Sequence, residues 1–69
     1  MTAPRTVDPS LRHGESGSRW GNLVAPAGAF AAGDLLRFEG EEGAHAVTRV
    51  LPFPGDPASR LVHYETTGR

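Results

Sequence analysis

The stretch that decides the fold is residues 33–53, which read GDLLRFEGEEGAHAVTRVLPF. Two runs of strand-like composition, residues 34–39 and 44–51, flank a Gly-Glu-Glu-Gly turn at residues 40–43. Glycine supplies the positive φ that tight turns need, and alternation of apolar and polar residues is typical of a strand with one buried face. The pattern therefore predicts a β-hairpin, and we expect the charged tip of its turn to be solvated.

The two strands of this hairpin differ in their patterning. In the first, Leu36 and Phe38 share a face whose opposite side carries two charged residues, so we assign both to the core. In the second, Val47 and Val50 both favour burial but lie on opposite faces of a regular strand. A β-bulge near Thr48–Arg49, or the strong bend of a small barrel, would bring both valines to the core.

Working outward from the hairpin, two further strands are expected, at residues 19–24 and 59–66. Residues 25–34 contain one proline and two glycines and favour a loop over a helical turn. Residues 52–57 contain three prolines and are predicted as a loop, since proline cannot donate to a central strand ladder. Short strands separated by Gly/Pro turns indicate an all-β fold, a four- to five-stranded antiparallel meander or SH3-like barrel.

A pattern within the hairpin resembles the paired strands of SH3-like barrels. Gly-Asp-x-Leu-x-Phe-x-Gly at residues 33–40 is followed by Val-x-x-Val at residues 47–50. This resemblance covers about twenty residues and implies the architecture alone. If such a sheet stays open, its edge strands expose unpaired backbone groups, and dimerisation through an edge is expected.

Residues 1–18 have a composition that does not favour a packed core. They contain two prolines, two glycines and little apolar material, so we expect a flexible, disordered tail followed by a β domain at residues 19–69. The alternative is a basic arm, because Arg5, Arg12 and His13 lie in this segment and Arg19 follows it.

Composition narrows the class of protein. The chain has 69 residues, a net charge of −1 and no cysteine, which allows one small domain without disulfides or thiolate metal sites. All seven basic residues are arginine, a usage typical of a GC-rich genome, so we expect a bacterial, phage or plasmid protein, such as an actinobacterial one. Neither a long apolar run nor an N-terminal apolar leader is present, and we expect a cytoplasmic protein.

The sequence offers weak support for a metal site or a catalytic site. The three histidines His13, His45 and His63 match no short metal-ligand spacing. Ser59, Asp56 and His63 contain the side chains of a hydrolytic triad, but the glycine-rich nucleophile motif is missing. We therefore expect no metal, no cofactor and no enzymatic activity.

The arginines of the predicted strands are the strongest candidates for binding. Arg37 and Arg49 would form one cationic face if they point outward from neighbouring strands. Such a face suits contacts with a protein partner or with nucleic acid, and the alternative is pairing with Glu39 and Glu65 on the surface. Trp20 is expected to pack over one end of the core, whereas an exposed Trp20 would mark a binding surface. The candidate binding residues are Arg37, Arg49, Arg60, His63, Tyr64 and Trp20.

These observations predict a small non-catalytic interaction module that binds a protein partner or self-associates. The alternative is a small β-barrel that binds nucleic acid through its strand-borne arginines. The net charge of −1 weighs against the alternative, because phosphate neutralisation supplies most non-specific affinity for nucleic acid.

Overall fold

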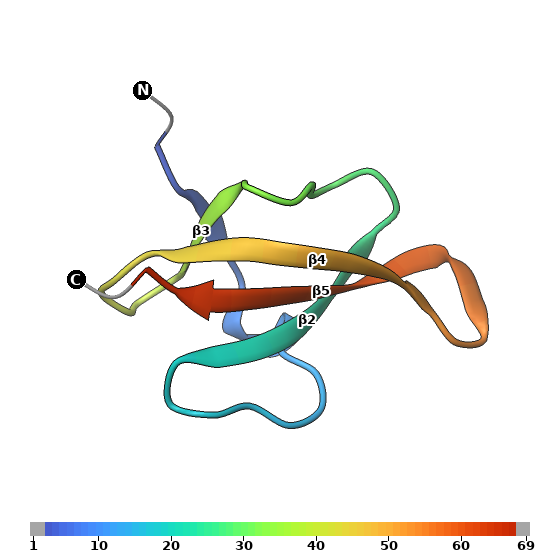
Figure 1. Ribbon diagram of the computed structural model, residues 1–69, viewed down its shortest axis with the longest axis horizontal. Coiled ribbons are helices and arrows are strands. Elements are labelled where there is room, and N and C mark those ends of the chain that lie inside the picture. The colour runs from blue at the N-terminus through green and yellow to red at the C-terminus, as the bar shows by residue number, and fades with distance from the viewer. Residues whose placement is uncertain (1–2, 68–69) are drawn as a thin grey trace.

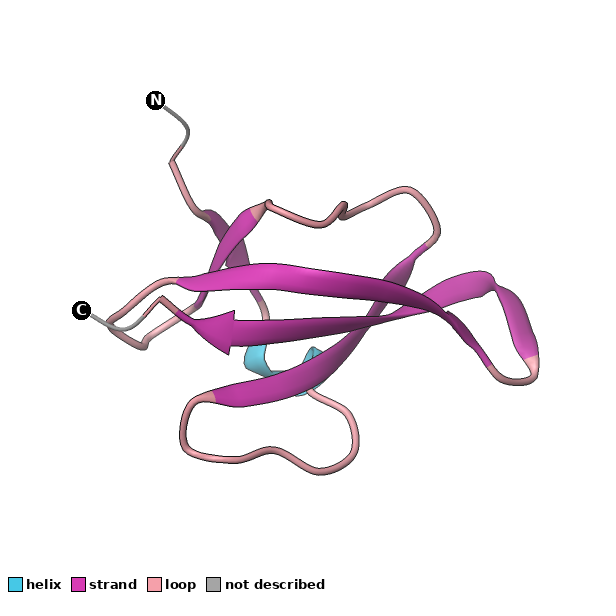
Figure 2. Cartoon of the chain, in the orientation of Figure 1, coloured by secondary structure: helices cyan, strands magenta, loops and turns pink. Residues whose placement is uncertain are grey.

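The computed structural model describes residues 3–67 and consists of one curved sheet with a single short helix (Figures 1 and 2). The elements, in chain order, are β1 (Arg5–Val7), the 3-10 helix η1 (Pro9–Leu11), β2 (Trp20–Pro26), β3 (Leu35–Phe38), β4 (His45–Phe53) and β5 (Asp56–Thr66). This confirms the all-β prediction. Within residues 3–67, no helix is long and apolar enough to cross a membrane.

The strand order is β1-β3-β4-β5-β2, so the sheet has β1 and β2 at its edges and is not closed. β3, β4 and β5 follow one another antiparallel, and β2 returns beside β5. β1 pairs with β3 in parallel. The prediction of a purely antiparallel meander is therefore wrong: the sheet is mixed, because the chain before β2 adds a parallel strand to the edge formed by β3.

The dominant hairpin is β4–β5 rather than β3–β4 (Figure 1). β3 and β4 pair at only two positions, Leu35 with Ala46 and Leu36 with His45. β4 and β5 stay paired almost to the turn at Gly55, whose φ of 83° suits glycine. The predicted loop at residues 52–57 is therefore largely strand. β4 tolerates proline there because its pairing with β3 has already ended, and an edge strand does not need every N–H as a donor.

The predicted bulge is confirmed. Val47 pairs with Tyr64 and Arg49 pairs with His63, so Thr48 is an extra residue between two consecutive pairs. The hydroxyl of Thr48 donates to the carbonyl of His63 at 3.2 Å, which satisfies a backbone group at the irregular step. Val47 and Val50, three residues apart, would lie on opposite faces of a regular strand. The extra residue brings both to the same side, so Val47 is buried and Val50 packs against the same core.

The core lies on one face of the curved sheet and draws on all five strands. Leu36 and Phe38 are fully buried, as the alternation in residues 34–39 predicted. The other buried residues are Val7, Leu23, Ala25, Val47, Val62 and Tyr64, with Ala29, Phe30 and Val50 packed against them. A core this small makes each contributing side chain important to stability.

The N-terminal segment differs from the expected flexible tail. Val7 of β1 is only 6% exposed and belongs to the core, and its carbonyl accepts a hydrogen bond from the N–H of Glu39 at 2.9 Å. Asp8 then caps η1 through its side chain. Beyond η1, Arg12 forms an isolated antiparallel bridge with Leu23 of β2. Residues 5–13 thus reach from one edge of the sheet to the other.

Replacing Val7 tests whether this segment belongs to the fold. Val7→Ala should lower the free energy of unfolding by about 1.5 kcal/mol, because it removes the equivalent of two buried methylene groups. Thr6→Ala, at the exposed neighbouring position of β1, is the matched control and should change stability little. Urea unfolding of both variants measures the difference. Equal stability of Val7→Ala and the unmodified chain would show that the segment does not pack on the core.

Candidate functional site

The structure does not gather the three predicted arginines on one face. Arg37 is exposed on β3 beside Thr6 of β1, and Arg49 is exposed on β4 opposite His63. Because Leu36 pairs with His45, the two arginines are separated by about 15 Å along the strand direction. The expected cationic surface across β3 and β4 is therefore not formed.

The guanidinium group of Arg60 is hydrogen-bonded within its own hairpin. Its Nη1 donates to the carbonyl of Pro57 at 2.9 Å and to that of Ser59 at 2.8 Å. Ser59 in turn donates through its hydroxyl to Asp56 at 2.8 Å, so the polar residues here stabilise the turn region. His63, the third component of the triad considered from the sequence, does not join them, since it bonds to Asn22 on another strand.

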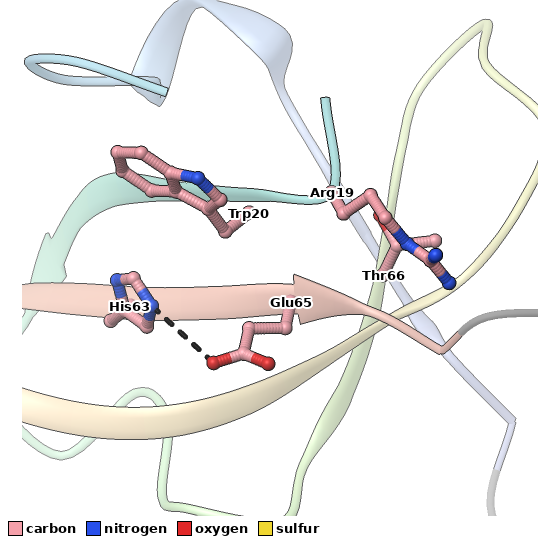
Figure 3. Close-up of a pocket in the computed structure, with 5 residues that line it drawn as sticks. All are labelled: Arg19, Trp20, His63, Glu65 and Thr66. Atoms are coloured by element: carbon pink, nitrogen blue, oxygen red, sulfur yellow. Dashed lines mark ion pairs between the residues drawn. The ribbon is translucent and has the colours of Figure 1, made fainter. Parts of the chain in front are cut away.

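Instead, the structure brings Trp20 and His63 together across β2 and β5. The indole and imidazole rings are stacked, with centroids 5.9 Å apart and planes inclined by 27°. Trp20 is 41% exposed, so the alternative of an exposed Trp20 is the arrangement found. Glu65 pairs with Trp20 in the strand register and Asn22 pairs with His63, so one polar group flanks each ring. Figure 3 shows the indole lying over His63.

The orientation of His63 is fixed by a chain of hydrogen bonds. Asn22 donates through its side-chain nitrogen to the carbonyl of Glu15 at 3.2 Å, which leaves its Oδ1 as an acceptor. Nδ1 of His63 lies 3.0 Å from that oxygen and therefore carries a hydrogen. The other ring nitrogen, Nε2, lies 3.7 Å from the carboxylate of Glu65 (Figure 3). His63 is thus held rigidly beneath the indole, with Nε2 directed toward an acidic group.

The backbone of Gly17 also lies against the indole. A Cβ at this position would overlap the indole nitrogen of Trp20 and would lie 2.9 Å from its Cδ1. The N–H of Gly17 also donates to the carbonyl of Trp20 at 3.0 Å. Trp20 therefore contacts both the backbone of Gly17 and the ring of His63, although much of its surface faces solvent.

An open hollow of about 570 Å³ adjoins this pair. It is lined by Arg19, Trp20, His63, Glu65 and Thr66 (Figure 3), and we call these five residues the Trp20 surface. An aromatic face, a cation, a carboxylate and a hydroxyl lie within one small area. Such a mixture can hold an apolar group against the indole while hydrogen bonds to the rim fix its orientation.

A smaller hollow of about 230 Å³ also adjoins Trp20 and shares Trp20 and Thr66 with the first. Arg12, His45 and Tyr64 also line it. Tyr64, a predicted binding residue, is buried, and its ring makes edge contacts with Phe38 at 5.2 Å and with His45 at 5.0 Å. Tyr64 therefore contributes mainly to the packing of the core.

Arg12 is the strongest electrostatic feature of this region. Its guanidinium lies 3.9 Å from the centre of the Phe38 ring and donates two hydrogen bonds to the carboxylate of Glu41, at 2.9 and 2.8 Å. These bonds hold the pKa of Glu41 below its ordinary value. The charged tip of the Gly-Glu-Glu-Gly turn, which was expected to be solvated, thus has Glu41 paired with the N-terminal segment.

His45 contacts the same aromatic cluster. Burial, with a smaller contribution from the positive charge of Arg12, lowers the pKa of His45. His13 contacts Phe53 instead, with ring centroids 5.1 Å apart, so the three histidines occupy three different environments. Within residues 3–67, no group of three or more His, Cys, Asp or Glu side chains is placed to hold a metal ion.

Sequence reasoning identified Trp20 and His63 but missed the residues that position them. Asn22 and Gly17 act through contacts across strands and around a turn, and no spacing signal marks them. Arg12 was considered only as part of a basic arm, because its partner Glu41 is 29 residues away. No protein-family model, curated protein or solved structure matches this chain.

The lowered pKa of His45 predicts a pH dependence of stability. A histidine whose pKa is depressed by folding favours the folded state in its neutral form, so stability is present above the unfolded pKa of 6.5 and declines as the pH falls below it. His45→Gln should reduce this decline between about pH 7 and pH 5. Urea unfolding of both proteins across this range measures the effect. An unchanged slope in the variant would contradict the assignment.

Proposed function

We propose that this protein is a small, non-catalytic interaction module that binds a protein partner through the Trp20 surface. The observation that carries the proposal is that Trp20 is 41% exposed but held in contact with both Gly17 and His63. A rigid, exposed tryptophan loses little conformational freedom on binding and buries a large area, which is why tryptophan is enriched among the residues that dominate binding energy.

The surroundings of Trp20 also favour a protein partner. Arg19 and Glu65 provide charges of both signs at the rim, and Thr66 provides a hydroxyl. Protein interfaces commonly place an aromatic anchor at the centre and polar groups at the edge. The hollow is open to solvent, whereas most catalytic sites exclude water, and this supports a binding role rather than catalysis.

Binding to nucleic acid, the alternative, has less support from the same geometry. Arg37 and Arg49 are far apart along the sheet, and Arg60 donates to backbone carbonyls of its own hairpin. A phosphate-binding surface needs several cations within reach of one nucleic-acid backbone.

We also propose that the fold is an open variant of the SH3-like barrel. The curvature of the sheet around one core supports this proposal.

Selection of peptides from a random library displayed on phage tests the proposal. Peptides selected on the unmodified protein should bind Trp20→Ala with at least about 30-fold lower affinity, which corresponds to about 2 kcal/mol at a dominant contact residue. Gly17→Ala, which displaces the indole without removing it, should weaken the same peptides. Leu11→Ala is the matched control, because Leu11 is 40% exposed on η1 and lies outside the Trp20 surface.

Two results would contradict the proposal. One is a set of selected peptides that bind Trp20→Ala as tightly as the unmodified protein. The other is Trp20-dependent binding of single- or double-stranded oligonucleotides in mobility-shift experiments that strengthens at low salt, which would assign the surface to nucleic acid.

A further inference from the structure

We call residues 5–13 the arm. The arm binds to the rest of the protein in the way that a peptide ligand binds to a receptor. β1 adds in parallel to the edge of β3, with Arg5, Thr6 and Val7 paired to Leu36, Arg37 and Phe38. Strand addition to a sheet edge, with one side chain buried in a pocket, is a common mode of peptide recognition. Val7 is the buried side chain here.

The far end of the arm makes the polar contacts of such a ligand. Arg12 binds the carboxylate of Glu41 through two parallel hydrogen bonds and covers the ring of Phe38. Paired bonds of this kind give both affinity and a defined orientation. His13 then donates through its N–H to the carbonyl of Asn22 at 3.0 Å. The arm therefore contacts both edge regions of the sheet. If the arm is removed, each of these regions becomes partly exposed.

The connection between the arm and β2 is short and exposed. Residues 14–18 read GESGS, and all five are exposed. Two hydrogen bonds tie this segment to β2, from Gly17 to the carbonyl of Trp20 and from Asn22 to the carbonyl of Glu15. Glycine and serine make the segment flexible once those bonds open. The arm can then leave the site that it occupies along β3, Phe38 and Glu41, which we call its groove, without unfolding β2.

We propose that the arm exchanges between two copies of this chain, each arm occupying the groove of the other copy. A second copy is the occupant that the groove fits, because its arm carries the same Val7 and the same Arg12 that Glu41 and Phe38 already bind. Exchange of an identical element creates no new interface chemistry and is a low-cost route to a dimer.

The length of the connection decides where the two copies meet. Five residues span at most about 17 Å when extended, so the starts of the two β2 strands must lie close together. Trp20 is the first residue of β2. Straightening of residues 14–18 also removes Gly17 from the indole, so exchange changes the environment of Trp20. The exchange depends on the arm and its groove, and it does not depend on the function proposed for the Trp20 surface.

Mixing two single-cysteine variants tests the exchange. Thr6→Cys and Arg37→Cys alter two exposed positions that are register partners on β1 and β3, and the natural chain has no cysteine. Neighbouring strands lie within disulfide distance. In the monomer each chain has one cysteine and no partner. If arms exchange, refolding the two variants together at high concentration and oxidising them should give a disulfide-linked heterodimer of Thr6→Cys with Arg37→Cys, which mass spectrometry of the intact, non-reduced protein distinguishes from the two homodimers.

The control pairs Thr6→Cys with Arg49→Cys, whose position on β4 is remote from β1. The heterodimer of the test pair should exceed that of the control pair several-fold and should increase with protein concentration during refolding. Circular dichroism confirms that each variant is folded. For the unmodified chain, light scattering should show a dimer after refolding at high concentration. A heterodimer yield no higher than the control, together with a strictly monomeric unmodified chain, would overturn the proposal.

Discussion

The position of Arg12 between the ring of Phe38 and the carboxylate of Glu41 is the interaction on which the structure depends. It fixes the N-terminal segment against Phe38 at the point where the chain crosses from β1, at one edge of the sheet, to β2, at the other. Val7 completes the attachment by entering the core itself. In so short a chain, a segment that adds a valine to the core and pairs with both edge regions matters to stability.

The same segment positions the exposed aromatic surface. After η1 and the bridge to Leu23, the chain turns back through residues 14–18 and places Gly17 against Trp20. Gly21 has a related role on β2, since a Cβ there would lie 2.7 Å from the Cζ atom of Tyr64. Two glycines thus let aromatic rings lie against the backbone, one ring on the surface and one in the core. The same N-terminal segment therefore contributes to the core and positions Trp20 in the candidate site.

Local pattern predicted the parts of this fold that depend on strand alternation. The burial of Leu36 and Phe38 follows from the charges on the opposite face of their strand, and the bulge at Thr48 follows from the conflict between Val47 and Val50. The last residues of β4 were predicted as a loop because proline disfavours a central strand. This part of β4 is not paired with β3, so it behaves as an edge, and the sequence does not show this.

The alternation of apolar and polar residues did not predict contacts between residues that are far apart in the sequence. The arm was predicted as a tail because its composition is polar, yet one valine and one arginine are enough to attach it when their partners lie 31 and 29 residues further along, in Phe38 and Glu41. The separation of Arg37 and Arg49 depends on strand register, which the turn does not specify. The stacking of Trp20 on His63 depends on β2 pairing with β5 rather than with its neighbour in sequence.

Amide hydrogen exchange measured residue by residue tests most directly whether the N-terminal segment completes the fold. Two amides report on it: the N–H of Glu39, which donates to the carbonyl of Val7, and the N–H of His13, which donates to that of Asn22. Both amides should exchange far more slowly than in an unstructured peptide. Exchange of both at the rate of an unstructured peptide, while the amides of β5 stay protected, would contradict it.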